Sequence, residues 1–205
     1  LVYGDAERLS ADAPVPILHV RSMESRPGGA ANVALDLAAL KGHVKAFGVV
    51  GKDASGALLK DELTKAGIDA TGVIEDAGRP TTLKQSLIGL AQTRHPQKMF
   101  RVDHESREPL SGQIKDQLLA AFAKELASCD VVCIEDYAKG VCSDDVCKEV
   151  IAMARRAGKP VFVDPARLSD YSKYAHASAI TPNRTEAETA AGIPTCNNAD
   201  PAHNV

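Results

Sequence analysis

Apolar and polar residues alternate in two different ways along the chain, and the change falls near residue 110. Beyond it, each short apolar run is followed by a longer segment in which apolar residues recur every three or four positions, as in an amphipathic helix. We expect strands at 131–135, 160–163 and 179–181, and helices at 111–127, 143–157 and 185–191. Regular alternation of strand and helix favours right-handed βαβ units and therefore a parallel sheet.

The first half of the chain contains β-rich segments that have no helix between them. Residues 81–90 and 98–103 are separated by a polar loop, and 15–20 is a weaker strand. Such strands fit poorly into a sheet of βαβ units, so we expect a small separate β-sheet, a lid, formed by residues 14–21 and 81–104. The remaining patterns of this half predict a helix at 30–40, a buried strand at 45–50, and a helix at 55–66 capped by Ser55.

The composition is that of an ordinary globular protein, with 44% hydrophobic and 25% charged residues in a chain of 205. This length predicts one domain over residues 1–205. The chain opens without an initiator methionine and stops without a closing element of structure, so we expect that domain to be incomplete.

The net charge of −3 offers no electrostatic argument for a nucleic-acid or membrane partner. No apolar stretch approaches the ~20 residues of a membrane span, and the first residues are not a signal peptide. We therefore predict a cytoplasmic protein. The cysteines form no C-x-x-C pair and have no histidine at zinc-ligand spacing, so we expect reduced, mostly buried thiols at Cys129, Cys133, Cys142, Cys147 and Cys196.

Two glycines precede the helix expected at 30–40. Gly28 and Gly29 would let a ligand approach the backbone, and the helix N-terminus behind them would direct N–H groups at it. Asn32, in the first turn, can donate to and accept from a hydroxyl group. An ordinary glycine turn with a solvated asparagine explains the same residues, so the motif alone leaves both interpretations open.

A charged turn follows the strand expected at 131–135. In open parallel sheets, ligands bind beyond the carboxyl ends of the strands. Asp136 and Lys139 could there bind sugar hydroxyls, a phosphate or a metal-bound water. The alternative is a solvated charged turn. The segments Gly51–Asp53 and Asp164–Pro165 also follow strands and are further candidates.

The segment from Asn183 to Glu186 lies where the last strand becomes a helix. A carboxylate near a phosphate site would be explained by magnesium, which proteins often hold through water. The same spacing matches a helix capping box, with Asn183 as N-cap and Glu186 three residues on. Both roles can hold together.

The two lid strands carry basic residues. Alternation places Thr82 with Lys84 on one face of the first strand and Arg101 with Asp103 on one face of the second. Such a face could meet an anionic sugar phosphate, since Arg suits bidentate phosphate contacts. The alternative is a solvated sheet edge protected by charge.

The order of these motifs is more specific than any one of them. The chain carries, in sequence, Gly28-Gly29-Ala30-Ala31-Asn32, Gly51-x-Asp53-x-x-Gly56, Asp136-Tyr137-Ala138-Lys139-Gly140, Asp164-Pro165 and Thr181-Pro182-Asn183-x-x-Glu186. In this it resembles the ribokinase-like (PfkB) carbohydrate kinases, and among them it looks like the heptose 7-phosphate kinases. The resemblance implies a three-layer α/β/α fold with a mainly parallel sheet and a small β-sheet lid.

The resemblance also implies roles for individual residues. ATP and Mg²⁺ would be the cofactors, a sugar phosphate the substrate, and the lid would cover the sugar and form a homodimer. The sugar site would contain Gly28, Gly29, Asn32, Lys84, Arg101, Asp136 and Lys139. The ATP site would contain Asn183, Arg184, Thr185 and Glu186, with Glu186 holding the metal through water.

Three departures from the family pattern bear on catalysis. The first family strand, with its sugar-binding Asp, would precede Leu1. Ala166-Arg167 follows Asp164-Pro165 where the heptose kinases usually have Lys. The G-A-G-D segment, with the catalytic base and the anion hole, is not in the chain. We therefore assign no catalytic residue here and expect these 205 residues alone to be nearly inactive.

Three other functions are compatible with parts of this pattern. A kinase of the same superfamily could act on fructose phosphate, ribose or a nucleoside. A non-catalytic remnant could bind sugar or dimerise through the lid. A nicotinamide oxidoreductase is the weakest alternative, because the glycine fingerprint and its downstream acid are not in place.

Overall fold

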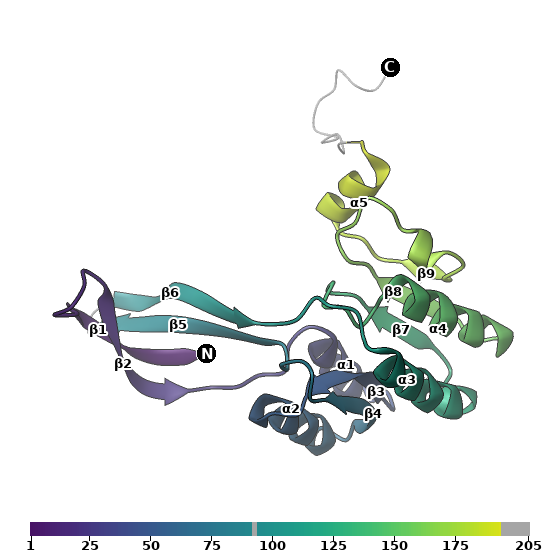
Figure 1. Cartoon of the computed structure of the whole chain (residues 1–205), viewed down its shortest axis with the longest axis horizontal. Coiled ribbons are helices and arrows are strands. Elements are labelled where there is room, and N and C mark those ends of the chain that lie inside the picture. The colour runs from purple at the N-terminus through teal and green to yellow at the C-terminus, as the bar shows by residue number, and fades with distance from the viewer. Residues whose placement is uncertain (92–93, 194–205) are drawn as a thin grey trace. The chain divides into compact units, whose positions relative to one another are not determined.

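The computed structural model describes residues 1–91 and 94–193, and the chain divides into two compact units (Figure 1). Unit 1 consists of Leu1–Val44, Val49–Ala70 and Glu75–Ser106. Unit 2 consists of Lys45–Gly48, Thr71–Ile74 and, among the described residues, 107–193. The expectation of one domain over residues 1–205 stays a prediction.

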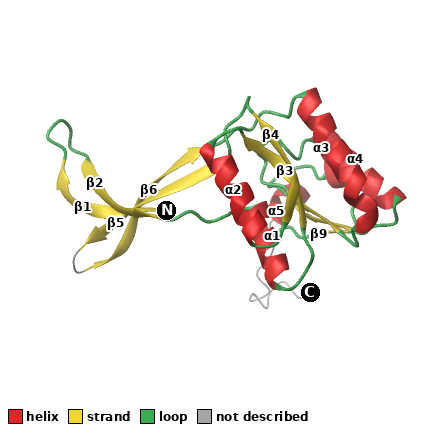
Figure 2. Ribbon diagram, turned by 90° about the horizontal axis from the view of Figure 1, so that it is seen from below, coloured by secondary structure: helices red, strands yellow, loops and turns green. Residues whose placement is uncertain are grey.

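Unit 1 contains a four-stranded sheet in the order β2-β1-β5-β6. Strand β1 runs antiparallel to β2 and parallel to β5, and β5 runs antiparallel to β6. Figure 2 shows these strands running together. The strands are β1 (Val2–Leu9), β2 (Pro16–Met23), β5 (Leu83–Ala91) and β6 (Arg94–His104).

Strand β1 was not predicted from the sequence. Its segment VYGDAERL combines a glycine with charged residues and has little β-propensity of its own. The strand is stabilised by pairing on both sides, with β2 and with β5. Gly4 is required where β1 approaches β2, because a Cβ there would collide with the carbonyl oxygen of His19.

Two helices complete unit 1. Helix α1 (Ala30–Ala39) begins at Gly29 and no side chain caps it. Helix α2 (Ala54–Lys65) begins at Asp53, whose Oδ1 accepts a hydrogen bond of 2.8 Å from the backbone N–H of Gly56. Asp53 is therefore the N-cap, and the prediction of Ser55 was wrong by two residues.

Strands β3 (Lys45–Gly51) and β4 (Asp69–Asp76) pair in a two-stranded sheet. The sequence predicted β3. It did not predict β4, whose segment DATGVIED is polar at both ends. Gly72 in β4 is required by the packing, because a Cβ there would collide with the ring of Phe47.

Unit 2 contains the parallel sheet β7-β8-β9, as the strand–helix alternation predicted. Helices α3 and α4 contact each other and lie side by side in Figure 1. The elements are β7 (Val132–Glu135), β8 (Val161–Asp164), β9 (Ala179–Ile180), α3 (Gly112–Glu125), α4 (Asp144–Arg156), α5 (Arg184–Ala191), and the short 3₁₀ helices η1 (Leu126–Ser128) and η2 (Ser172–Tyr174).

The core of unit 2 lies between this sheet and its helices. Val161 and Val163 of β8 are fully buried, and Ile151 and Ala154 of α4 are part of the same cluster. Phe162, between the two valines, is exposed, so only one face of β8 is covered. Each buried branched side chain contributes roughly 1.5–3 kcal/mol relative to exposure.

Four of the five cysteines lie within the described residues and are free thiols. Cys147 is buried, Cys129 and Cys142 are half-buried, and Cys133 is exposed, so the expectation of mostly buried thiols holds only in part. Cys196 lies outside the described residues. None of the helices in residues 1–91 and 94–193 is both long and apolar enough to cross a membrane.

Candidate active site

The carboxyl ends of the parallel strands in unit 2 gather the polar residues of several motifs. Glu135 ends β7 and pairs in register with Asp164, which ends β8. The backbone N–H of Asp136 donates to the carbonyl oxygen of Asp164 over 3.0 Å, and the hydroxyl of Thr181 lies 3.4 Å from the Asp164 carboxylate. This edge is where an open parallel sheet binds its ligands.

Three carboxylates and two phenols share this edge of the sheet. Burial raises the pKa of Glu135, and the negative charge of Asp164 raises it further. Burial also raises the pKa of Tyr137, with further contributions from Glu135, Asp164 and Glu186. The pKa of Tyr171 rises for the same reason, with contributions from Glu186 and Asp164. The cluster therefore gathers negative charge at this edge of the sheet.

Two buried oxygen atoms of this cluster have no hydrogen-bond partner among the described residues. They are Oε2 of Glu135 and the hydroxyl of Tyr171. A buried carboxylate oxygen without a donor is costly unless a cation binds it. Carboxylate oxygens are also the ligands that Mg²⁺ prefers. Glu135, Asp164 and Glu186 could thus hold a divalent cation. The sequence predicted only Glu186 in such a role. Asp164 was a candidate because it follows a strand, whereas Glu135 was expected only as the last residue of one.

The segment from Asn183 to Glu186 forms the capping box that its spacing predicted. The backbone N–H of Glu186 donates to Oδ1 of Asn183 over 3.0 Å, and the backbone N–H of Asn183 donates to Oε2 of Glu186 over 2.8 Å. Arg184 forms an ion pair of 3.3 Å with Glu188 one turn along α5. Contacts of Asn183, Arg184, Thr185 and Glu186 with ATP stay predictions.

Asp136 lies inside unit 2, with only 1% of its side chain exposed. Its Oδ2 lies 2.5 Å from Nζ of Lys173 and accepts a hydrogen bond of 2.6 Å from the hydroxyl of Tyr174, while Oδ1 accepts from the backbone N–H of Ala138. Both oxygens are therefore engaged by the protein. This geometry favours a structural role, and contact of Asp136 with a substrate stays a prediction.

Lys173 and Tyr174 were not anticipated as partners of Asp136. Lys173 is buried, and its Nζ also donates to the carbonyl oxygen of Cys142 over 2.9 Å. Burial and the hydrogen bond to Asp136 raise the pKa of Tyr174. No local pattern marks a lysine in a short 3₁₀ helix as a buried ion-pair partner, because the partner lies 37 positions earlier in the sequence.

Lys139 lies in the loop that follows β7. The loop turns through two residues with positive φ, Ala138 at 53° and Gly140 at 77°. A Cβ at Gly140 would collide with the carbonyl oxygen of Glu108, so this position requires glycine for both its dihedral angle and its space. Lys139 is half-buried, and its predicted contact with a substrate is untested.

In unit 1, the structure places Gly28, Gly29 and Asn32 at the open N-terminus of α1. Gly29 has φ 54° and ψ −134°, a conformation essentially restricted to glycine. A Cβ at Gly28 would meet nothing within 4 Å, so the space beside it is open. Asn32 is exposed and donates to Asp36 over 3.1 Å. An open helix N-terminus beside an amide side chain could bind a hydroxyl group. Contact of Gly28, Gly29 and Asn32 with a sugar stays a prediction.

Lys84 and Arg101 lie on one face of the four-stranded sheet. Lys84 pairs in register with Asp103 on β6, and Arg101 is two residues from Asp103 on the same strand. Arg101 forms a bidentate ion pair with Asp103, with distances of 2.7 and 2.9 Å. The predicted basic face is therefore partly neutralised by Asp103, and contact of Lys84 and Arg101 with a phosphate stays a prediction.

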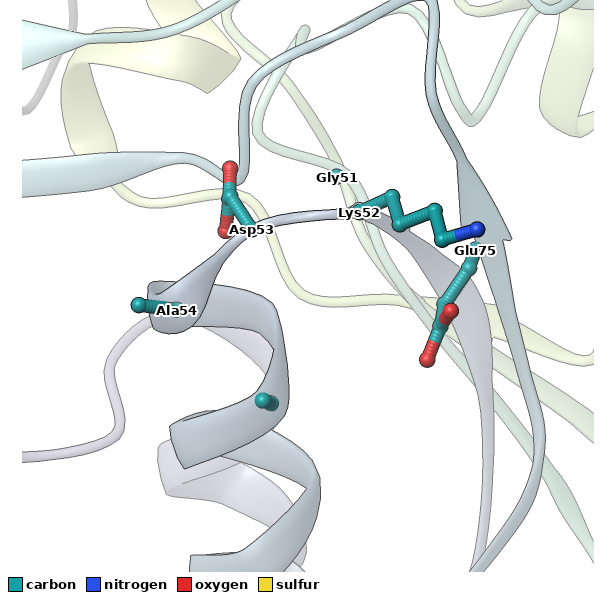
Figure 3. Close-up of a pocket in the computed structure, with 6 residues that line it drawn as sticks. Gly51, Lys52, Asp53, Ala54 and Glu75 are labelled. Carbon is teal, nitrogen blue, oxygen red and sulfur yellow. The ribbon is translucent and has the colours of Figure 1, made fainter.

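Residues Gly51, Lys52 and Asp53 line a shallow cavity of about 350 Å³ together with Ala54, Ala57 and Glu75 (Figure 3). Lys52 extends toward Glu75 in this view, and Asp53 points away from both. The Asp53 carboxylate accepts hydrogen bonds from the backbone N–H and the hydroxyl of Thr81, at 2.8 and 2.7 Å. These bonds and those from the α2 N-terminus lower the pKa of Asp53.

Comparison with known proteins places the chain among sugar kinases. Residues 2–204 match the profile of the pfkB family carbohydrate kinases. The chain is 40% identical over 192 residues to the bifunctional protein HldE of Wolinella succinogenes, covering 94% of this chain and 39% of that protein. It is 44% identical over 189 residues to HldE of Helicobacter pylori, covering 92% and 40%. The chain thus spans about 40% of the length of these relatives.

Solved structures confirm the predicted ribokinase-like α/β fold. The ribokinase of Arabidopsis thaliana complexed with ribose and ATP matches with a TM-score of 0.65 at 19% identity, over 96% of this chain and 61% of that one. The tetrameric inhibited form of phosphofructokinase-2 from Escherichia coli matches with a TM-score of 0.61 at 15% identity, over 96% and 62%.

Proposed function

Because the chain belongs to the pfkB family of carbohydrate kinases, we propose that it forms part of an ATP-dependent kinase that phosphorylates a hydroxyl of a sugar phosphate. The observation that carries this proposal is the carboxylate cluster at the ends of β7 and β8, where Oε2 of Glu135 is buried without a donor. Phosphoryl transfer needs such a cation site, since catalysis there rests on positioning and charge stabilisation.

The cofactors that fit this arrangement are ATP and Mg²⁺. Glu135, Asp164 and Glu186 would hold the metal ion, in part through water. When bound, Mg²⁺ neutralises charge on the phosphoryl group during transfer. Asn183, Arg184 and Thr185, at the start of α5, would contact ATP, and the capping box keeps the Glu186 carboxylate at this helix terminus.

The substrate we propose is heptose 7-phosphate, phosphorylated at O1 on the route to ADP-heptose for lipopolysaccharide. The heptose kinase motifs support it, as does 40–44% identity to HldE proteins. In unit 1, Gly28, Gly29 and Asn32 would bind sugar hydroxyls, and Lys84 and Arg101 would face the phosphate. In unit 2, Lys139 would lie near the substrate and Asp136 would support its loop. No residue of this chain is assigned as the catalytic base.

A homodimer through the four-stranded sheet is part of this proposal. Large apolar side chains of the sheet are exposed, including Met23 at 67% and Phe100 at 55%. Exposed apolar strands of this kind mark surfaces that pair with another chain. We also propose that the enzyme acts in the cytoplasm, where ATP is available.

The experiment measures ADP release by the complete protein that contains this chain, with heptose 7-phosphate, fructose 6-phosphate or ribose as acceptor. We expect selective turnover of the heptose phosphate. Turnover of another sugar would retain the kinase and discard the heptose assignment. If none is turned over, the non-catalytic alternative gains support.

A binding measurement tests the metal site in the 205-residue chain itself. Titration with Mn²⁺ as a probe for Mg²⁺ should show weaker binding in Glu135→Gln. The matched control is Glu149→Gln, which removes an exposed carboxylate from α4. Equal loss in both variants, or no loss in either, would contradict the assignment.

A further inference from the structure

Two cysteines face each other at the N-terminus of α4. Ser143 is the N-cap of this helix, so Cys142 occupies the position before the cap and Cys147 the fourth helical position. Side chains at these two positions pack against each other in the hydrophobic staple of many helices. Here Sγ of Cys142, Sγ of Cys147 and a carboxylate oxygen of Asp136 all lie within 4.8 Å of one another.

A metal ion is a poor occupant for this cluster. Nζ of Lys173 lies 2.5 Å from Oδ2 of Asp136 and also donates to the carbonyl oxygen of Cys142. The carboxylate is therefore already neutralised by a buried cation. A structural zinc site would also need four ligands, and this group offers three. The chemistry that remains is that of two thiols in contact.

The surroundings of the two thiols differ in a way that favours their reaction with each other. A hydrogen bond from Cys142 lowers the pKa of Cys147, and the charge of Lys173 lowers it further against the opposing effect of burial. The thiol of Cys142 also lies 3.9 Å from the backbone carbonyl oxygen of Glu135, to which it can donate. The sulfur of Cys147 therefore has a second thiol within contact distance and a buried lysine nearby, as in reactive cysteine pairs.

We propose that Cys142 and Cys147 form a reversible redox-modification site, which closes to an intramolecular disulfide under a peroxide oxidant. In the first step a thiolate sulfur attacks an oxygen of hydrogen peroxide, the O–O bond breaks, and sulfenic acid and water form. The second thiol then attacks that sulfur, an S–S bond forms and a second water leaves. In sum, two thiols and one peroxide give one disulfide and two waters.

The geometry requires only a local closing movement. The two sulfur atoms must approach from a separation within 4.8 Å to a bond of about 2.05 Å. Cys142 lies in the loop before α4, where backbone can move more easily than in the helix that holds Cys147. Cys142 is half-buried as a residue and Cys147 is buried, so a small oxidant would reach the pair when this loop opens locally.

The sequence supplies both a readout and an internal control. Trypsin cleaves after Lys139 and after Lys148, so residues 140–148 form one peptide that contains both cysteines of the pair. The preceding peptide, 125–139, contains Cys129 and Cys133. Cys133 lies on the exposed face of β7, between the buried Val132 and Ile134. The thiol of Cys129 instead donates to the backbone carbonyl oxygen of Glu125 over 3.4 Å, so it is not engaged with Cys133.

The experiment treats the 205-residue chain with hydrogen peroxide, blocks remaining thiols with iodoacetamide and measures the tryptic peptides by mass spectrometry. We expect peptide 140–148 to lose the mass of two hydrogen atoms and both alkyl groups, and dithiothreitol to restore them. Peptide 125–139 should remain doubly alkylated at the same dose. The proposal is overturned if peptide 140–148 stays alkylated at doses that oxidise the exposed Cys133.

Two variants test whether the mass loss of peptide 140–148 comes from a bond between Cys142 and Cys147. Cys142→Ser changes a half-buried loop residue and should abolish the light form of peptide 140–148, which is the form that lacks two hydrogen atoms and both alkyl groups. Cys133→Ser should preserve this light form. Circular dichroism of Cys142→Ser checks that the chain is folded. A light peptide that persists in Cys142→Ser would also overturn the proposal, because no second sulfur is then present in residues 140–148.

Discussion

Strands β7 and β8 of unit 2 bury one face almost completely, whereas the four-stranded sheet of unit 1 leaves large apolar side chains exposed. Val161 and Val163 of β8 have no exposed surface, while Met23 and Phe100 of unit 1 are more than half exposed. The sheet of unit 2 is therefore stabilised by side-chain packing against helices, and the sheet of unit 1 mainly by hydrogen bonds between strands. Substitutions should consequently have unequal effects in the two units.

The largest expected difference concerns ion pairs. Lys173→Met leaves Asp136 as an unpaired charge inside unit 2, which should cost about 3–5 kcal/mol of unfolding free energy. Arg101→Met breaks a pair in unit 1 in which the arginine side chain is 48% exposed, and should cost about 0.2–1 kcal/mol. Urea unfolding of both variants measures the difference. Equal costs would show that the two charges are similarly solvated.

A slightly smaller difference is expected for apolar truncation. Ile151→Ala in α4 removes a side chain from a core in which the residue is 2% exposed, and should cost about 2–5 kcal/mol. Phe100→Ala on β6 removes a larger side chain that is 55% exposed and should cost less. Thermal unfolding compares the two. A greater loss for Phe100→Ala would indicate that another chain covers the unit 1 sheet.

Helix caps offer an intermediate comparison. Asn183→Ala removes the cap of α5 in unit 2 and should cost about 1 kcal/mol. Asp53→Ala in unit 1 removes the cap of α2 and also the two bonds to Thr81, so its cost should be larger. Hydrogen exchange in the first turn of each helix measures the loss. A smaller effect for Asp53→Ala would mean that the Thr81 bonds contribute little.

The smallest effects concern pH, and they have opposite signs in the two units. The pKa of Asp53 is lowered in the folded state. Its stabilising contribution to the free energy of unfolding is therefore present above the ordinary Asp pKa near 3.9 and is lost as pH falls. The pKa of Glu135 is raised in the folded state. Its stabilising contribution to the free energy of unfolding is therefore present below the ordinary Glu pKa of about 4.3 and is lost as pH rises.

Two variants test these signs by urea unfolding across this range. At neutral pH, Asp53→Asn should be less stable than the wild type and Glu135→Gln more stable. Both differences should shrink in acid. A Glu135→Gln variant that is destabilised at neutral pH would contradict the origin we assign to the raised pKa of Glu135.

The same contrast explains which parts of the structure the sequence could predict. The elements of unit 2 follow from local periodicity, and the capping box at Asn183 follows from spacing alone. Strand β1 could not be predicted, because its stability comes from two partners distant in the sequence. The burial of Asp136 against Lys173 was invisible for the same reason. At the strand ends, the sequence marked Asp164 as a candidate but not Glu135, and only the register of β7 and β8 revealed the two as a paired cluster.

The Asp53 carboxylate has a mechanical consequence for unit 1. It joins the N-terminus of α2 to Thr81, and strand β5 begins two residues later, at Leu83. Thr81 is buried, and its hydroxyl also accepts a hydrogen bond from the backbone N–H of Gly51. Hydrogen bonds thus fix the chain at Thr81, immediately before β5. Any pivot of β5 must lie at residues 82–83, and a motion that reaches further back would fray the first turn of α2.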